Sequence, residues 1–417
     1  MQKQEEMNIL VPEKIAEIER DSISEDTDAV FFDADNDGDL DLYVCSGGRA
    51  FSKSSSALKD RLYLNAGDFN FSRSSGLVFP DYFSSSSVSV IDFDEDGDLD
   101  LLVTERFHPF RYGTPVNAYL MQNDGRGSFQ DVGNEKLMTL KGTSMMTDSK
   151  VGDLDGDGDL DLVVATDWDN VKILINQDGK FVEKTEEYGL GHSKGWWKTV
   201  ELIDVDKDGD LDILAGNHGL NSFFRDTTRL YIKDFDRNGT YDYIFCEKVN
   251  GEYYPVADKN DLISQLPILK KKLLYFKDYA SMTIEDIFGE QGLKEALVLD
   301  ASTKATMLFI NEGTSFKSKT LPGAVQYGPV YAINGKDMDA DGYPEAVIGG
   351  NQFLVKPQFG RYDALPLMVL DGLESKPEAH LSNIINQVRS IEVVNCDTKK
   401  LIIVINNDSK VQVYEKR

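Results

Sequence analysis

Aspartate is crowded into six short stretches of this sequence, and its spacing in them is that of a cation-binding loop. The stretches share the template D-x-D-x-[DN]-G-x-x-[DE] and begin at Asp33, Asp92, Asp153, Asp204, Asp234 and Asp337. Carboxylates gathered by a glycine turn repel one another, and water screens that repulsion only in part. A cation removes the repulsion. Several hard oxygen ligands suit Ca²⁺ better than Mg²⁺, which tends to keep its water.

The template predicts which atoms bind the metal. Positions one, three, five and nine supply side-chain oxygens, position seven supplies its backbone carbonyl, and the glycine at position six permits the turn. For the first four loops the predicted ligands are Asp33, Asp35, Asp37, Asp39 and Asp41; Asp92, Asp94, Asp96, Asp98 and Asp100; Asp153, Asp155, Asp157, Asp159 and Asp161; and Asp204, Asp206, Asp208, Asp210 and Asp212.

The last two loops depart from the template, and we expect them to bind the metal more weakly. The fifth has one carboxylate fewer, and the sixth ends on a longer side chain beside Pro344. Their predicted ligands are Asp234, Asp236, Asn238, Thr240 and Asp242, and Asp337, Asp339, Asp341, Tyr343 and Glu345. Up to six calcium ions are therefore expected.

Two other interpretations of the loops fit less well. An EF-hand loop opens in the same way but requires Glu at position twelve, on an exiting helix. Position twelve in these loops is always apolar: Val44, Val103, Val164, Ala215, Phe245 and Ile348. Ordinary polar turns would show a mixture of Asn, Ser and Gly instead of aspartate at fixed spacing.

The loops lie between predicted β-strands. Apolar runs such as "LYVCSG", "LVVAT" and "AVIGGN" follow them, and a run such as "AVFF" comes before most of them. Short runs rich in Val, Ile and aromatic residues predict strands, so each loop closes a hairpin. A second phrase, "RLYLNAGDFNF" or "VKILINQDGKF", adds two more strands around an Asn and Gly turn. Each repeat therefore carries about four antiparallel strands.

Units of this size tile a β-propeller. We predict an all-β fold in which residues 1–27 lead into a single domain, 28–417, with seven four-stranded blades beginning near residues 28, 87, 145, 196, 229, 328 and 385. About 258–292 the β-pattern is replaced by a helical insertion. There Leu266, Leu269, Leu273 and Leu274 form a partial helical face, and Thr283 begins a helix.

Composition narrows the range of partners. The net charge of −28 argues against nucleic acid, which needs clustered Lys and Arg. The sequence contains no run of 18 apolar residues, so no transmembrane helix is predicted. Cys45, Cys246 and Cys396 lie far apart in strand-like runs, which favours buried thiols over disulfides or a metal site.

Calcium availability indicates the compartment. Weak calcium modules fill only at extracellular calcium, so we expect an extracellular or outer-membrane surface location. The opening "MQKQEEMNILVPEK" lacks the layout of a secretion signal. The sequence is therefore expected to be part of a larger polypeptide or complex.

The loops and the phrases around them resemble the FG-GAP or VCBS repeats of integrin-α-type β-propellers. The order of "VFFDADNDGDLDLYVCSGG", "DRLYLN", "GWWKTVELIDVDKDGDLDILAGNHGLNS", "QLPILKKKLLYFKDYASMTIEDIF" and "GRYDALP" further resembles large bacterial repeat proteins that carry an ASPIC/UnbV domain, although that domain itself is not recognised here. The resemblance runs from about Asp28 to the C-terminus. It implies a secreted or surface-anchored bacterial protein, often a lipoprotein, with a binding or scaffolding role and no particular reaction.

No catalytic motif stands out. The four histidines form no zinc spacing, and the sequence has no GxSxG, P-loop or GxGxxG motif. We therefore expect a binder of proteins or glycans and no enzyme. The alternative is a calcium-dependent polysaccharide lyase or glycoside hydrolase, since two suitably spaced carboxylates suffice for glycoside hydrolysis.

Aromatic residues are the predicted partner-binding groups. Trp196 and Trp197 could stack on a sugar or anchor a protein, or they could pack between blades. The segments "GLNSFF" and "GRYDALP", the latter with Arg361 and Tyr362, could bind a partner or serve only to anchor their loops.

Overall fold

Antiparallel β-sheet makes up most of the chain. The computed structural model describes residues 15–52, 54–79, 82–373, 376–396, 399–407 and 409–415. Nearly all strands in these ranges belong to sheets of three to five strands, with short helices between them, so the all-β prediction is confirmed. The predicted lead-in, 1–27, reaches into the first strand, which begins at Glu25, and residues 1–14 lie outside the described ranges.

The first three sheets follow one another in chain order. They comprise β1 (Glu25–Phe32), β2 (Asp41–Gly47), β3 (Arg61–Asn65) and β4 (Phe71–Arg73); β5 (Ser84–Ile91), β6 (Asp100–Phe107), β7 (Ala118–Asn123) and β8 (Phe129–Asp131); and β9 (Met145–Gly152), β10 (Asp161–Asp169), β11 (Lys172–Asn176) and β12 (Phe181–Glu183), with β13 (Gly195–Trp196) paired to β10. The second strand β2 is buried along its whole length. Burial on both faces explains why such strands read as continuous apolar runs.

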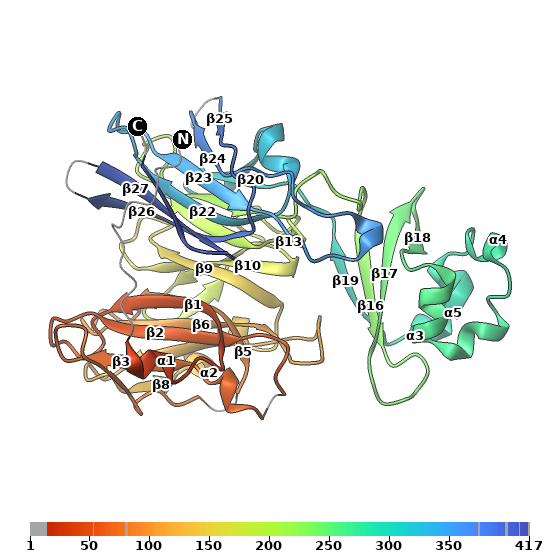
Figure 1. Ribbon diagram of the computed structural model, residues 1–417, viewed down its shortest axis with the longest axis horizontal. Coiled ribbons are helices and arrows are strands. Elements are labelled where there is room, and N and C mark those ends of the chain that lie inside the picture. Colours follow the sequence, from red (N-terminus) through yellow and green to blue (C-terminus); the bar gives the residue numbers. More distant parts are fainter. Residues whose placement is uncertain are drawn as a thin grey trace.

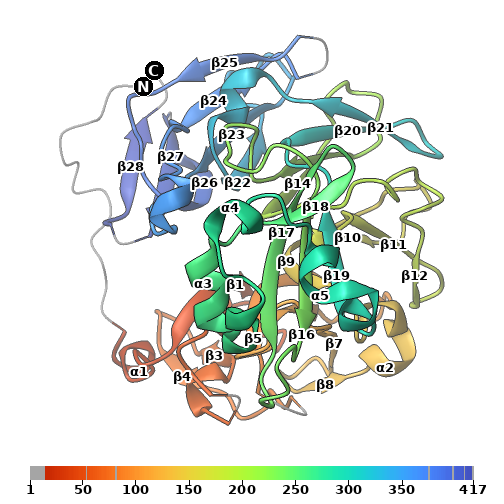
Figure 2. The same cartoon turned by 90° about the vertical axis from the view of Figure 1, so that its right-hand side faces the viewer.

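Three further sheets continue the series. They comprise β14 (Thr199–Ile203), β15 (Asp212–Gly216), β20 (Met307–Asn311) and β21 (Phe316–Thr320); β22 (Val330–Lys336), β23 (Glu345–Gly350), β24 (Met368–Asp371) and β25 (Glu378–Leu381); and β26 (Val388–Cys396), β27 (Lys399–Asn406) and β28 (Gln412–Glu415). The first strands of successive sheets contact one another in the order β1, β5, β9, β14, β22, β26. Figure 2 shows these sheets arranged around the middle of the molecule, as in a β-propeller.

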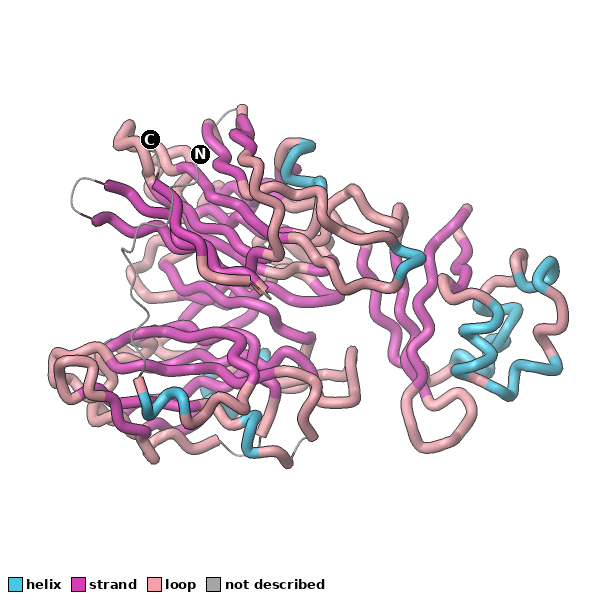
Figure 3. The backbone as a smooth tube through the Cα atoms, viewed as in Figure 1, coloured by secondary structure: helices cyan, strands magenta, loops and turns pink. Residues whose placement is uncertain are grey.

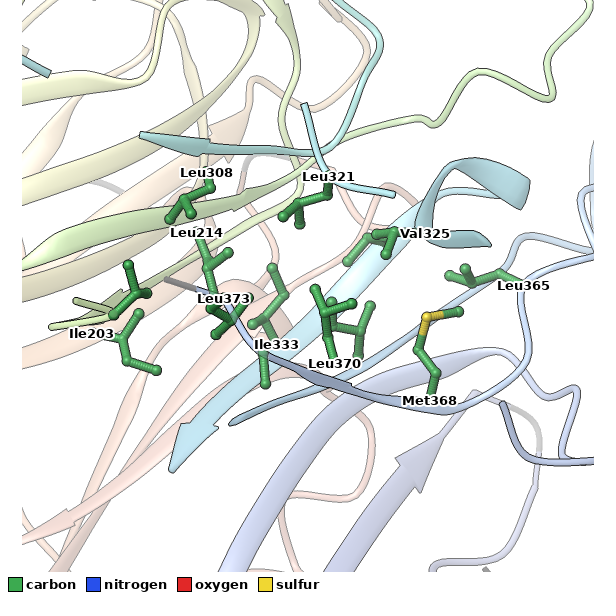
Figure 4. Packing of buried hydrophobic residues seen from close by; sticks show 14 residues of the cluster. Ile203, Leu214, Leu308, Leu321, Val325, Ile333, Leu365, Met368, Leu370 and Leu373 are labelled. Atoms are coloured by element: carbon green, nitrogen blue, oxygen red, sulfur yellow. The ribbon is translucent and has the colours of Figure 1, made fainter. Parts of the chain in front are cut away.

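Apolar side chains fill the spaces between neighbouring sheets. Between the sheet that begins with β14 and the sheet that begins with β22, Leu214 and Leu308 lie with Ile333, Met368 and Leu370 (Figure 4), and all five are buried. Burying a side chain of this size stabilises the fold by about 1.5–3 kcal/mol. Neighbouring sheets are thus held together by packing of side chains and not by backbone hydrogen bonds between their strands.

One sheet stands outside the series, and the prediction of seven blades is not confirmed. It contains β16 (Thr228–Lys233), β17 (Asp242–Val249), β18 (Glu252–Pro255) and β19 (Leu297–Ala301), which lie between β15 and β20 in the sequence although β15 pairs directly with β20. In Figure 1 this sheet projects to the right of the other six. The unit predicted near residue 229 is therefore part of an inserted arm, residues 217–306. The prediction of a blade there failed because a hairpin with an acidic loop has the same sequence pattern whether its sheet belongs to the series or to the inserted arm.

Helices form the far end of this arm. They are α3 (Lys259–Gln265), the 3₁₀ helix η3 (Pro267–Lys271), α4 (Phe276–Tyr279) and α5 (Ile284–Leu293), drawn in cyan at the right of Figure 3. The predicted start at Thr283 is confirmed by a capping box, in which its hydroxyl accepts from the N–H of Asp286 and the carboxylate of Asp286 accepts from the N–H of Thr283.

The predicted apolar face of this helical segment is only partly correct. Leu266, Leu269 and Leu273 are buried against the inserted sheet. Leu274 is 63% exposed, because η3 has already ended at Lys271 and the chain turns before α4. Elsewhere, the predicted burial of Cys45 and Cys246 is confirmed, and the side chain of Cys396 lies outside the described residues.

Candidate metal centres

All six acidic loops have one backbone design. The glycine at position six has a φ between +89° and +101°, as predicted, and the residue at position four is also left-handed, with φ between +58° and +77°. The second left-handed position was missed from the sequence, where only Gly156 hinted at it. In every loop the first carboxylate accepts a hydrogen bond from the N–H of position six at 2.8–3.2 Å.

This backbone brings carboxylates together. In at least five loops of the described part of the chain, three carboxylate oxygens lie within 4.8 Å of one another: Asp33, Asp35 and Asp37; Asp92, Asp94 and Asp96; Asp153, Asp155 and Asp161; Asp204, Asp206 and Asp212; and Asp234, Asp236 and Asp242. Spacing of this kind suits a cation with many oxygen ligands. These clusters can therefore bind a metal ion.

Several of these oxygens are buried without a hydrogen-bond donor. Among the described residues, the Oδ1 atoms of Asp33, Asp35, Asp92 and Asp94 have no partner. Burying an unpaired charged oxygen is costly, and a bound cation removes that cost. Burial, and then the neighbouring carboxylate at position five, raises the pKa of Asp35 and of Asp94. The donor set thus fits a hard divalent cation.

Position nine has a structural role in addition to its predicted one. The Oδ1 of Asp161 accepts from the N–H of Asn176 and its Oδ2 accepts from the N–H of Leu154, both at 2.8 Å. Asp41 and Asp212 make the same pair of bonds in their own sheets. Burial raises the pKa of Asp161 and Asp212 to about 6. This carboxylate therefore ties the loop to the third strand of its sheet.

Asparagine at the end of the third strand links neighbouring sheets. The Nδ2 atoms of Asn123, Asn176 and Asn311 donate to carbonyl oxygens at position two of the preceding acidic loop: Ala34 at 2.8 Å, Phe93 at 3.0 Å and Leu154 at 2.9 Å. From the sequence, only turns were predicted at these asparagines. Their identical place after an apolar strand in four repeats was the available signal.

Asn123→Ala is expected to reduce the free energy of unfolding by about 2 kcal/mol, because it removes the side-chain donor that bonds to the buried Ala34 carbonyl of the neighbouring sheet. Urea unfolding measured by circular dichroism would test this. Asn65 is the matched control: its Nδ2 donates to Leu40 O of its own sheet at 3.2 Å, as Asn123 does to Leu99 O, but it donates to no neighbouring sheet among the described residues. The Oδ1 atoms of both residues are without a donor in the described part of the chain. Equal losses for Asn65→Ala and Asn123→Ala would contradict a link between sheets.

Acidic loops of neighbouring sheets touch one another. Asn36 Nδ2 donates to Asp98 Oδ1 at 2.7 Å, and Lys207 Nζ lies 4.3 Å from the centre of the Tyr343 ring. In each pair a residue at position four meets position seven of the next loop in the series. The same juxtaposition places Glu95 beside Asp159, whose carboxylate raises the pKa of Glu95. Loops of neighbouring sheets are therefore in contact at three places, and the fifth loop, on the inserted arm, is separate from them.

The predicted partner-binding tryptophans do not face solvent. Trp197 is buried and its Nε1 donates to Ser193 O at 2.8 Å. Trp196 is 6% exposed and packs edge to face against Trp168 and Phe224. The Trp196 ring occupies the core between the series of sheets and the inserted arm, and Trp197 lies in the core between two sheets of the series, so neither is available to a partner.

The predicted loop segments do come together at the surface. Phe223 of "GLNSFF" and Phe359, next to "GRYDALP", have ring centres 5.1 Å apart. Tyr362 is buried against His218, which corrects its prediction as a binding residue, whereas Arg361 is exposed and stacks 3.7 Å from the Phe353 ring. We define the aromatic loop patch as Leu220, Phe223, Tyr327, Leu354, Phe359 and Arg361.

The comparisons with known proteins agree with the repeat pattern. Residues 33–103 and 153–215, which contain the first four acidic loops, match the family model described as FG-GAP-like repeat. No curated protein sequence matches the chain. Among the described helices, none has the length and apolar character to cross a bilayer.

Two solved structures are similar over most of their length. One is BBS1N, crystallised in complex with ARL6DN, with 10% identity over 92% of this chain and 90% of that chain and a TM-score of 0.36. The other is the V. cholerae biofilm matrix protein Bap1, with 13% identity over 93% of this chain and 68% of that chain and a TM-score of 0.36.

Proposed function

We propose, on the premise that this chain is an FG-GAP repeat protein of the β-propeller type, that it is a calcium-binding scaffold outside the cytosol that holds a protein or glycan partner. The observation that carries the calcium assignment is the set of buried, donorless carboxylate oxygens at positions one and three. In the loops beginning at Asp33 and Asp92 the same atoms are left without a donor. That recurrence is expected of a ligand site and not of an ordinary turn.

The predicted location follows from the affinity expected of such loops. Calcium modules built from short exposed loops bind with Kd values of about 10⁻⁴–10⁻³ M, which only extracellular calcium fills. We therefore place the chain at a cell surface or outside the cell, in a bacterial surface assembly. The further likeness to proteins with an ASPIC/UnbV domain stays a prediction from the sequence.

The aromatic loop patch is the proposed partner surface. Five of its residues lie on connections between second and third strands, and Tyr327 lies on the connection from β21 to β22, all at the opposite ends of the sheets from the acidic loops. Leu354 is 82% exposed and Phe223 is 43% exposed, and Arg361 adds a stacked cation. Exposed aromatic and Arg side chains are the usual anchors of protein and glycan contacts.

Calcium binding is tested by isothermal titration calorimetry on chelator-treated protein. We expect several binding events, fewer after Asp35→Asn and Asp94→Asn are combined. Absence of binding heat, together with no alkaline earth metal in elemental analysis, would overturn the assignment.

The partner surface is tested by capture from native surface extracts in calcium. Phe223→Ser and Leu354→Ser are combined in one double variant, which is compared with Met138→Ser, a change at an exposed apolar residue elsewhere. We expect capture to be lost only with the double variant, because only that variant removes anchors of the aromatic loop patch. Capture that survives it would place the partner surface elsewhere.

A further inference from the structure

The inserted arm ends in apolar side chains that face solvent. Ile268 is 58% exposed, Leu274 63%, Tyr275 61% and Phe276 57%. The neighbouring Leu266, Leu269 and Leu273 are buried in the core of the arm. The exposed apolar residues of the segment are therefore not needed for that core. Three consecutive exposed apolar residues are unusual on a soluble surface and mark an interaction site.

The same segment is basic in a strongly acidic chain. Residues 267–277 include four lysines and no Asp or Glu, against a net charge of −28 for the whole sequence. Lys270 and Lys271 are exposed, and neither forms an ion pair with any residue that the structure describes. We define the insertion tip as Ile268, Lys270, Lys271, Leu274, Tyr275 and Phe276.

The tip lies at an extremity of the molecule. The arm replaces the connection between β15 and β20, at the opposite end of that sheet from its acidic loop. Figure 1 shows α4 and α5 at the far right, away from β1, β2 and β3. The fifth acidic loop joins β16 to β17 on the same arm, whereas the other five acidic loops belong to the series of sheets. An approaching anionic surface would therefore meet the lysines of the tip while those five loops stay at a distance.

We propose that the insertion tip binds an anionic lipid surface. Leu274, Tyr275 and Phe276 enter the boundary between headgroups and acyl chains, and Lys270 and Lys271 pair with lipid phosphates. Aromatic rings and lysines are the residues that favour this interface. Apolar side chains that enter the interface and lysines that attract anionic headgroups both contribute to the free energy of binding at a membrane surface.

The shape of the tip favours lipid over a protein partner. The exposed apolar residues come from one short segment at the end of a projecting arm. A protein interface requires about 800 Å² from each partner, with pockets for its anchors. A bilayer needs only a small projection that can enter it.

Co-sedimentation with vesicles tests the proposal. We use phosphatidylcholine vesicles with and without phosphatidylglycerol and expect binding only when phosphatidylglycerol is present. Leu274→Ser with Phe276→Ser, or Lys270→Glu with Lys271→Glu, should each weaken binding about tenfold or more. Val249→Ser, on the same arm, and Lys180→Glu, on a distant turn, are the matched controls and should bind as the unchanged protein does.

Two further measurements keep the outcome clear. Binding should persist in EGTA, because the tip does not use the acidic loops, so its failure is distinguishable from failure of the calcium proposal. Tyr275→Trp fluorescence should shift to the blue when the anionic vesicles are added. Lack of binding, or binding that the tip variants leave unchanged, would overturn the proposal, as would tip-dependent capture of an acidic protein by a chain that ignores the vesicles.

Discussion

Removal of divalent cations by EGTA is expected to lower the midpoint of thermal unfolding by about 8 °C. At calcium about ten times above Kd, five independent sites stabilise the fold by about 7 kcal/mol, and a chain of this length unfolds with an entropy that converts this into that shift. Differential scanning calorimetry with and without calcium measures it. An unchanged midpoint would mean that the carboxylate clusters of Asp33 to Asp242 bind no calcium.

The metal-free protein should also respond to pH in a characteristic way. Burial raises the pKa of Asp100 to about 7 and those of Asp161 and Asp212 to about 6, above the values of an unfolded chain. Their protonation therefore stabilises the folded state at low pH, and that contribution is lost as the pH rises through 6 and 7. In EGTA we expect the midpoint to be higher at pH 5 than at pH 7.5.

Calcium should reduce or reverse this trend, because it binds the ionised carboxylates. Asp28 and Asp60, away from the loops, also have pKa values raised to about 6 by burial. Their contribution is present with and without metal. The difference between the two pH profiles therefore isolates the loops, and identical profiles would count against calcium binding.

Asp161→Ala is expected to reduce the free energy of unfolding by about 4 kcal/mol even in EGTA. The change leaves the backbone N–H groups of Leu154 and Asn176 without an acceptor in a buried setting, at a cost of about 1–3 kcal/mol each. Chemical unfolding monitored by circular dichroism measures the loss.

Asp157→Ala is the matched control for that experiment. Asp157 is exposed at position five of the same loop. In EGTA its removal should leave stability unchanged or raise it, because one repelling charge is lost. In calcium, both variants should lose stability. Equal effects in EGTA would show that position nine acts only as a metal ligand.

The sequence predicted the loops well because their chemistry is local. Asp spacing and the glycine at position six recur within nine residues, and a turn of this kind is determined by those residues alone. The strands on either side followed from their apolar runs. The capped helix start at Thr283 was likewise a local signal.

What the sequence could not show depends on distant neighbours. The inserted sheet has the same hairpin pattern as the others, and only the pairing of β15 with β20 places it outside the series. Trp196 is buried because the inserted arm covers it, which no local pattern encodes. The bonds of Asn123 and Asn176 reach carbonyl oxygens more than 80 residues away in the chain.

The seating of the arm has a mechanical consequence. It leaves and re-enters through adjacent antiparallel strands, and its root is packed on Trp168 and Trp196. Because the arm is joined to the series at both of its ends and its root is buried, we expect it to hold a fixed orientation and not to move as a flexible linker would. A partner bound at the end of the arm is then held at a constant distance from the acidic loops of the series.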